Sequence, residues 1–200
     1  MYVTEAQTFY EQLKTDKLLN LTEKLTFHQS IIIRKFCSLK VPKTIFGKIR
    51  AVKSLVKGLI SAGLIPKIKV KVCLFGKGLA SMTEDGKIWL YAKFLFRQPY
   101  CESVLTVLHE LAHVKLWLWE DYSALKQCDG EFVQNYVKNI SCTVVSPIEY
   151  YANVIAIDWL NQVISEIAEK ERLNQLNVAK KRLIEKLIKA KENLFKSTGD

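Results

Sequence analysis

The stretch His109-Glu110-Leu111-Ala112-His113 decides which fold we expect for this chain. Two histidines four residues apart lie on the same face of an α-helix, so both imidazoles can reach one metal ion. The glutamate between them can accept a proton from a water molecule at that metal. Neutral imidazole suits Zn²⁺, and a catalytic zinc has three protein ligands and one open position. The motif predicts a zinc site with His109 and His113 as ligands, Glu110 as the general base, and a third ligand elsewhere.

The residues around the motif favour a helix with one apolar side. Apolar residues recur there at three- and four-residue steps, namely Val104, Val107, Leu111, Val114 and Leu118. His109 and His113 point away from most of this stripe. We therefore expect a helix that packs against a core on one side and faces a cleft on the other.

The spacing of residues does not by itself identify the third zinc ligand. A metzincin is excluded, because Leu116 and Trp119 stand where that class needs a glycine and a histidine. His28 is the remaining histidine, and we interpret it as a packed or surface residue of an upstream helix. The candidates are downstream carboxylates and cysteines: Glu120, Asp121, Cys128, Asp129, Glu131, Cys142, Glu149 and Asp158.

Glu149 differs from the other candidates because it opens a second apolar helix, expected over residues 147–160. A ligand there would come from a separate helix that faces the first. The same stretch also fits a capping box, in which Ser146 caps the helix and the Glu149 side chain reaches back to the Ser146 backbone N–H. Spacing alone leaves both interpretations open.

The two motifs together resemble a known family. His109-Glu110-Leu111-Ala112-His113, followed by Glu149-Tyr150-Tyr151-Ala152-Asn153, is similar to the gluzincin-type peptidases of the ImmA/IrrE group and the related minigluzincins. The resemblance covers about residues 43–160. It implies that His109, His113 and Glu149 bind Zn²⁺ and that Glu110 is the catalytic base for hydrolysis of a protein or peptide substrate. Asn153 stands where many gluzincins have an aspartate that orients a histidine ligand.

The pattern before the motif predicts a helix, a strand and a hairpin. Residues 44–62 form an amphipathic helix that Gly63 can end. Residues 68–74 alternate apolar residues with lysine, as in a half-buried strand. Asp85-Gly86 separates two short strands in a hairpin signal. If an edge strand borders the zinc cleft, an extended peptide could pair with it through backbone hydrogen bonds.

These elements indicate an α+β fold. Together with the resemblance, they predict a small zincin-like (gluzincin) core with a short mixed or antiparallel sheet and the H-E-x-x-H helix. We expect an N-terminal helical extension over residues 1–42, the core over residues 43–160, and a C-terminal helical extension over residues 161–200 that packs on the core. Two helices are expected within residues 4–38. The Asn174-Gln175-Leu176-Asn177 stretch is a candidate bend in the C-terminal helix.

Composition predicts a cytoplasmic location. No apolar run approaches the length of a membrane span, and residues 1–20 lack the apolar core of a signal peptide. The five cysteines form no C-x-x-C pair, which fits a reducing compartment. Cys101 is a candidate nucleophile near His109, but it lacks an identifiable activating partner, so we favour the metal chemistry.

Charge leaves two interpretations open: a solvated basic face, which is the commoner case, and a surface over residues 34–77 for an anionic partner. The formal net charge is +10, and the segment from Arg34 to Lys77 contains twelve basic residues and no acidic one. Such a surface could attract nucleic acid, an anionic membrane or an acidic protein. Two alternatives to a peptidase therefore remain: a basic nucleic-acid-binding protein, and a non-catalytic protein that binds zinc and a partner.

Overall fold

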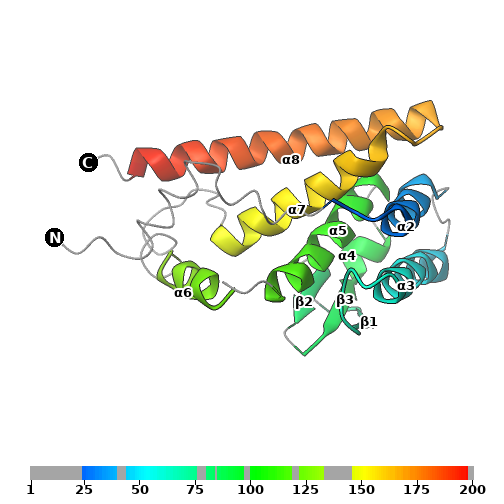
Figure 1. Cartoon of the computed structure of the whole chain (residues 1–200), viewed down its shortest axis with the longest axis horizontal. Coiled ribbons are helices and arrows are strands. Elements are labelled where there is room, and N and C mark those ends of the chain that lie inside the picture. Colours follow the sequence, from blue (N-terminus) through cyan, green and yellow to red (C-terminus); the bar gives the residue numbers. More distant parts are fainter. Residues whose placement is uncertain are drawn as a thin grey trace.

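A computed structural model describes residues 24–39, 44–75, 80–83, 85–96, 100–118, 122–132 and 146–197. The elements in chain order are α2 (Phe27–Ser38), α3 (Ile45–Ser61), β1 (Lys69–Cys73), β2 (Ala80–Thr83), β3 (Lys87–Tyr91), α4 (Ala92–Phe96), α5 (Tyr100–Trp117), α6 (Tyr122–Phe132), α7 (Pro147–Ile164) and α8 (Lys170–Ser197). The fold is α+β, as expected, with helices packed around one small sheet (Figure 1). The first of the two expected N-terminal helices lies outside the described residues.

The sheet is mixed and has the strand order β1-β3-β2. β1 runs parallel to β3, with Lys69 opposite Lys87 and Cys73 opposite Tyr91. β2 runs antiparallel to β3 and forms the expected hairpin at Asp85-Gly86. Gly86 has a φ of 73°, which glycine adopts without steric cost. Among the described strands, β1 and β2 are the two edges of the sheet.

The expected helix over residues 44–62 is α3, and it ends before Gly63, as predicted. Thr44 accepts a hydrogen bond from the Gly47 N–H at the N-terminus. At the C-terminus Gly63 has a φ of 70°, and the Leu64 N–H donates to the Leu59 carbonyl. This Schellman arrangement ends the helix and directs the chain into β1.

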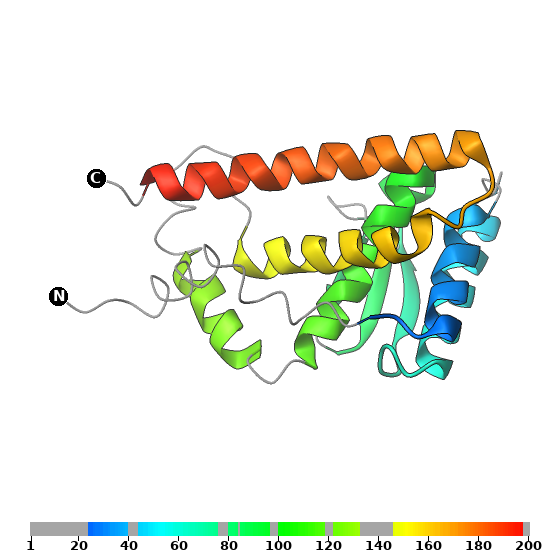
Figure 2. The same cartoon turned by 45° about the horizontal axis from the view of Figure 1, so that its top comes forward.

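α5, which carries the two histidines, is the central helix of the core. Val104, Val107, Leu111 and Val114 of the expected apolar stripe are each 0% exposed, as is Leu108. Leu118, the last residue of the expected stripe, is 59% exposed, because the helix ends at Trp117. α5 packs against α7 on one side and against β2 on the other (Figure 2). Because the stripe fixes the rotation of α5, the opposite face of the helix holds His109 and His113 at a defined position.

The helices outside residues 43–160 pack on the same core. Ile33 of α2 and Leu176 of α8 are both 0% exposed and belong to one cluster with the α5 stripe. α8 therefore packs on the core. The candidate bend at Asn174–Asn177 is wrong, because α8 runs continuously through it while Leu176 is buried. The chain turns earlier, between the end of α7 and Lys170. None of the helices in the described ranges has the length and apolarity needed to cross a bilayer.

Candidate metal centre

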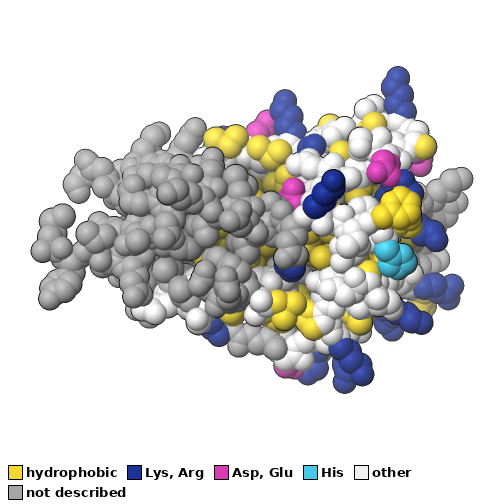
Figure 3. All heavy atoms as spheres, in the orientation of Figure 1, with side chains coloured by type: hydrophobic (Ala, Val, Ile, Leu, Met, Phe, Trp, Pro, Cys, Tyr) yellow, Lys and Arg dark blue, Asp and Glu magenta, His cyan; other side chains and the backbone are white. Residues whose placement is uncertain are grey.

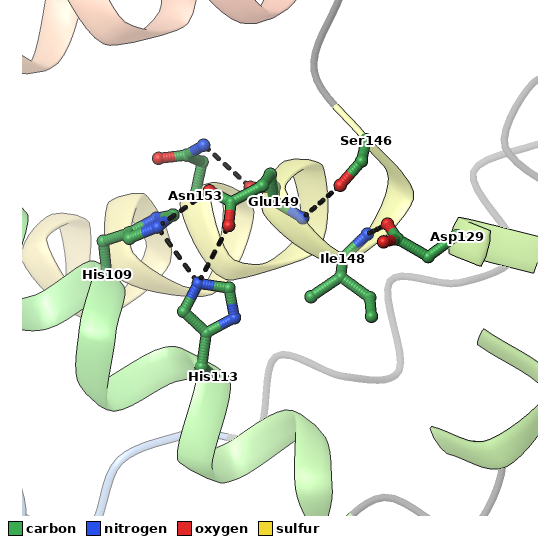
Figure 4. A network of polar contacts seen from close by, with 7 residues as sticks. All are labelled: His109, His113, Asp129, Ser146, Ile148, Glu149 and Asn153. Carbon is green, nitrogen blue, oxygen red and sulfur yellow. Dashed lines mark hydrogen bonds and ion pairs between the residues drawn. The ribbon is translucent and has the colours of Figure 1, made fainter. Parts of the chain in front are cut away.

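Three side chains from two helices converge beside α5. His109 and His113 project from α5, and Glu149 projects toward them from the first turn of α7 (Figure 4). The Nε2 atoms of the two histidines are 3.1 Å apart. The Glu149 carboxylate lies 3.1 Å from His109 Nε2 through Oε2 and 3.4 Å from His113 Nε2 through Oε1. Each residue thus offers one ligand atom to a common point, and the ligand atoms all lie within 4.8 Å of one another.

These distances fit a zinc ion. Zinc binds imidazole nitrogen and carboxylate oxygen at about 2.0–2.2 Å in tetrahedral geometry, which separates neighbouring ligand atoms by about 3.3 Å. The two imidazole nitrogens are 3.1 Å apart, and the two Glu149 oxygens lie 3.1 Å from His109 and 3.4 Å from His113, so the three side chains could hold one metal ion. Two nitrogens and one carboxylate oxygen also form the donor set of a catalytic zinc site with one open position. The residues present therefore fit the metal that the motif predicts.

The start of α7 fixes the position of Glu149. Ser146 is the N-cap, and its hydroxyl oxygen lies 3.5 Å from the Glu149 backbone nitrogen, which donates to it. Asp129 of α6 accepts a hydrogen bond of 3.0 Å from the Ile148 N–H. The Glu149 carboxylate points to the imidazoles instead of back to the Ser146 N–H. The Ser146 half of the expected capping box therefore forms, while the Glu149 side chain is directed to the histidines.

The site is strongly polarised. Hydrogen bonds from His109 and His113 lower the pKa of Glu149, although partial burial opposes this shift. Burial lowers the pKa of His109, but its contacts with the Glu149 and Glu110 carboxylates outweigh burial and the pKa is raised. The two carboxylates stabilise positive charge at the imidazole. A bound cation would be stabilised by the same carboxylates.

His109 has a second ring nitrogen that is relevant to metal binding. Its Nδ1 atom is buried and makes no hydrogen bond. Asn153 lies one turn after Glu149, donates a hydrogen bond of 2.7 Å to the Glu149 carbonyl oxygen, and lies beside His109 (Figure 4). Metal-binding histidines usually donate this second N–H to an acceptor. The Asn153 amide oxygen is a candidate acceptor at the position that the sequence singled out.

Glu110 is buried beside the ligands. It is 7% exposed, and its carboxylate is close enough to raise the pKa of His109. It lines both cavities that open at the site. A carboxylate that borders the cleft next to the ligand set is placed to exchange a proton with a water molecule there.

Two cavities meet at the three ligands. The larger, of about 700 Å³, extends from His109 and Glu149 to the face of α8 that carries Arg182 and Lys186. The smaller, of about 410 Å³, is bordered by the aromatic side chains of Trp117 and Tyr122. Ala80 of the edge strand β2 lines both cavities, and Ser81 lines the smaller one. The site therefore opens to both sides along β2.

The other candidate ligands are not brought into this group. Asp129 caps α7, and Asp158 accepts a hydrogen bond from Gln162 farther along the helix, where burial raises the pKa of Asp158. His28 is exposed on α2. The remaining candidates fall on residues or side chains outside the described part of the chain: Cys101, Glu120, Asp121, Cys128, Glu131 and Cys142.

Sequence reasoning did not identify the residues that α8 and β2 contribute to the cleft. Arg182 of α8 lies 3.7 Å from Glu102 of α5, which ties the C-terminal helix to the helix that carries the histidines. Ala80 and Ser81 have no chemical signature in the sequence. Their part in the cleft follows only from the packing of β2 against α5.

Comparison with known proteins gives no family for this chain. No protein-family model matches it, and no curated protein and no solved structure matches it significantly.

Proposed function

We propose that this chain is a zinc-dependent metallopeptidase of the gluzincin type, similar in its site to the ImmA/IrrE group. The observation that carries the proposal is the convergence of His109, His113 and Glu149, whose ligand atoms all lie within 4.8 Å of one another, with the Glu110 carboxylate buried beside them. His109 and His113 would supply two nitrogen ligands, and Glu149 would supply the oxygen ligand. A bound zinc ion would polarise the scissile carbonyl group and lower the pKa of a water molecule.

The residues of the chain account for the proton transfers. Glu110 takes a proton from the attacking water and returns it to the leaving amine. Its burial beside His109 keeps the carboxylate within the cleft. With a metal on Nε2, His109 would carry its proton on Nδ1, and the amide oxygen of Asn153 beside it would accept that proton and orient the ring.

The shape of the cleft supports a peptide substrate. β2 is an edge strand, and its residues Ala80 and Ser81 border the ligands. An extended peptide that pairs with this edge would cross the site with its backbone fixed by hydrogen bonds. Side chains on either side of the scissile bond would then enter the two cavities, one with aromatic walls and one bordered by α8.

The test is cleavage of a peptide mixture of diverse sequence by the zinc-loaded full chain, with the products identified by mass spectrometry. Glu110→Gln is the matched variant, because it keeps the three ligands and removes only the base. We expect the wild type to cleave and the variant to bind zinc without cleaving. Cleavage by Glu110→Gln at the wild-type rate would refute the assigned role of Glu110. Zinc binding without cleavage of any peptide by the wild type would favour the non-catalytic zinc protein.

A further inference from the structure

Large apolar side chains are exposed at one end of the sheet. Phe46 is 80% exposed, Phe75 is 87% exposed, and Leu74 and Phe96 are each 60% exposed. Single exposed apolar residues are common on protein surfaces, but a group of large ones marks an interaction site. We call Phe46, Leu74, Phe75 and Phe96 the phenylalanine end.

The topology brings these four residues to the same end of the molecule. Leu74 and Phe75 directly follow β1, whose last residue Cys73 is opposite Tyr91 at the end of the parallel strand β3. α4 follows β3 without a break and ends at Phe96. The beginning of α3 lies against α4, because Lys48 donates a hydrogen bond of 3.0 Å to the Leu95 carbonyl. Phe46 precedes Lys48 by two residues and lies with it in the first turn of α3.

The surroundings of the phenylalanine end are basic. Arg50, Lys71 and Lys93 are exposed on α3, β1 and α4. The sequence from Arg34 to Lys77 has no acidic residue, and neither has α4. Lys and Arg side chains also gather on the side of the surface where α3 lies (Figure 3).

The acidic residues of the described elements lie outside α3, β1 and α4. Glu102 of α5 faces Arg182 at 3.7 Å. Glu169 and Glu171 stand at the start of α8, which lies against the last turn of α2, because Arg172 donates to the Cys37 carbonyl. The segment from Arg34 to Lys77 contributes +12, so the rest of the chain, with eighteen basic and twenty acidic residues, has a net charge of −2. The excess positive charge of the protein therefore lies in the segment that contains α3 and β1, to which Phe46, Leu74 and Phe75 belong.

We propose that the phenylalanine end binds the surface of an anionic lipid bilayer. Phenylalanine and leucine side chains would enter the boundary between headgroups and acyl chains, while Arg50, Lys71 and Lys93 would contact anionic headgroups. Loss of one inserted phenylalanine should weaken binding about tenfold, and loss of one basic residue about fivefold. Aliphatic Leu74 favours lipid over nucleic acid, because single-stranded nucleic acid is held by stacking on aromatic rings. This inference does not depend on the proposed peptidase activity.

The experiment is sedimentation of the full chain with vesicles of phosphatidylcholine, with and without phosphatidylserine. Phe46→Ser and Phe75→Ser are the test variants. Phe27→Ser is the matched control, because Phe27 is 81% exposed but begins α2 at the opposite end of α3, where Gln29 donates to the Ala62 carbonyl. A charge variant, Arg50→Glu with Lys93→Glu, tests the electrostatic part. All these side chains are exposed, so thermal unfolding of each variant should match that of the wild type.

We expect the wild type and Phe27→Ser to bind vesicles that contain phosphatidylserine, and each phenylalanine variant to bind about tenfold more weakly. The charge variant should lose most of its preference for phosphatidylserine. Failure of the wild type to bind these vesicles, or an equal loss in Phe27→Ser, would overturn the proposal. Binding to a single-stranded DNA oligonucleotide without binding to vesicles would overturn it in favour of nucleic acid.

Discussion

Asp129 should hold the first turn of α7, and with it the ligand Glu149, in place. The first residue of α7 is Pro147, which has no N–H, so the free donors of this turn begin at Ile148 and Glu149. Asp129 accepts a hydrogen bond of 3.0 Å from the Ile148 N–H, and Ser146 accepts one of 3.5 Å from the Glu149 N–H. The shorter bond involves a carboxylate at a helix N-terminus, where negative charge is favourable. Asp129→Ala therefore removes the better of the two acceptors.

These contacts determine how much Asp129→Ala should lower the free energy of unfolding. Loss of a capping acceptor lowers the free energy of unfolding by about 0.5–2 kcal/mol, and loss of the charge alone by about 0.3–1 kcal/mol. Asp129→Ala should therefore cost about 1–2 kcal/mol, while Asp129→Asn, which keeps an acceptor, should cost about half as much. The part of this free energy that is lost on ordering the first turn for metal binding would lower zinc affinity, by up to roughly 30-fold in the alanine variant.

The assay is urea unfolding of the metal-free protein, together with zinc titration against a chelator of known affinity, for the wild type and both variants. The expected order for stability and for zinc affinity is wild type, Asp129→Asn, Asp129→Ala. Wild-type stability and zinc affinity in Asp129→Ala would refute the reasoning that α6 positions the third ligand.

Three further predictions concern the cleft, the core and a buried thiol. Lys186 lines the larger cavity, so Lys186→Glu should slow cleavage of peptides with an acidic residue near the scissile bond about two- to fivefold relative to neutral peptides; an unchanged ratio of the two rates would argue against contact with substrate. Leu111 is 0% exposed, so Leu111→Ala should lower the free energy of unfolding by about 2–5 kcal/mol in urea, and a loss well below 1 kcal/mol would contradict its place in the core. Burial raises the pKa of Cys37 from 9.0 to about 12, although the positive charge of Arg172 opposes this. The unfolded thiol ionises first as pH rises, so stability should fall above pH 9, by about 1 kcal/mol at pH 10, and Cys37→Ala should lack this contribution; equal pH dependence in both proteins would count against the burial of the thiol.

Features set by local chemistry could be predicted from the sequence. Gly63 and Gly86 adopt positive φ at the end of α3 and in the β2–β3 turn, as their positions indicated. The stripe from Val104 to Val114 is buried because its spacing matches the helical period. The spacing of His109 and His113 places both imidazoles on one face for the same reason.

The third ligand could not be decided from spacing, because Ser146 and Glu149 satisfy two patterns at once. The backbone of Glu149 does contribute to capping, as one pattern predicts. The direction of its carboxylate depends on where α5 packs against α7, which is a contact between distant parts of the sequence. Only the packed structure brings the Glu149 oxygens to 3.1–3.4 Å from the imidazoles.

The C-terminal helix shows a second limit of local reasoning. The asparagines at 174 and 177 suggested a bend, but burial of Leu176 between them outweighs their weak helix preference. The helical period of the C-terminal segment also indicated an apolar face, but it did not indicate which part of the chain this face packs against. The packing of α8 beside α5 brings Arg182 and Lys186 to the larger cavity, and neither residue has a spacing that points to a site.

Zinc content per chain tests the central claim most directly. The measurement is elemental analysis of protein purified without an affinity tag, for the wild type, Glu149→Ala and the control Asp158→Ala on the same helix. We predict about one zinc per chain in the wild type and the control, because three ligand atoms converge there, and a clear loss in Glu149→Ala. Absence of zinc from the wild type after incubation with the metal, or equal zinc in Glu149→Ala, would contradict a centre formed by His109, His113 and Glu149.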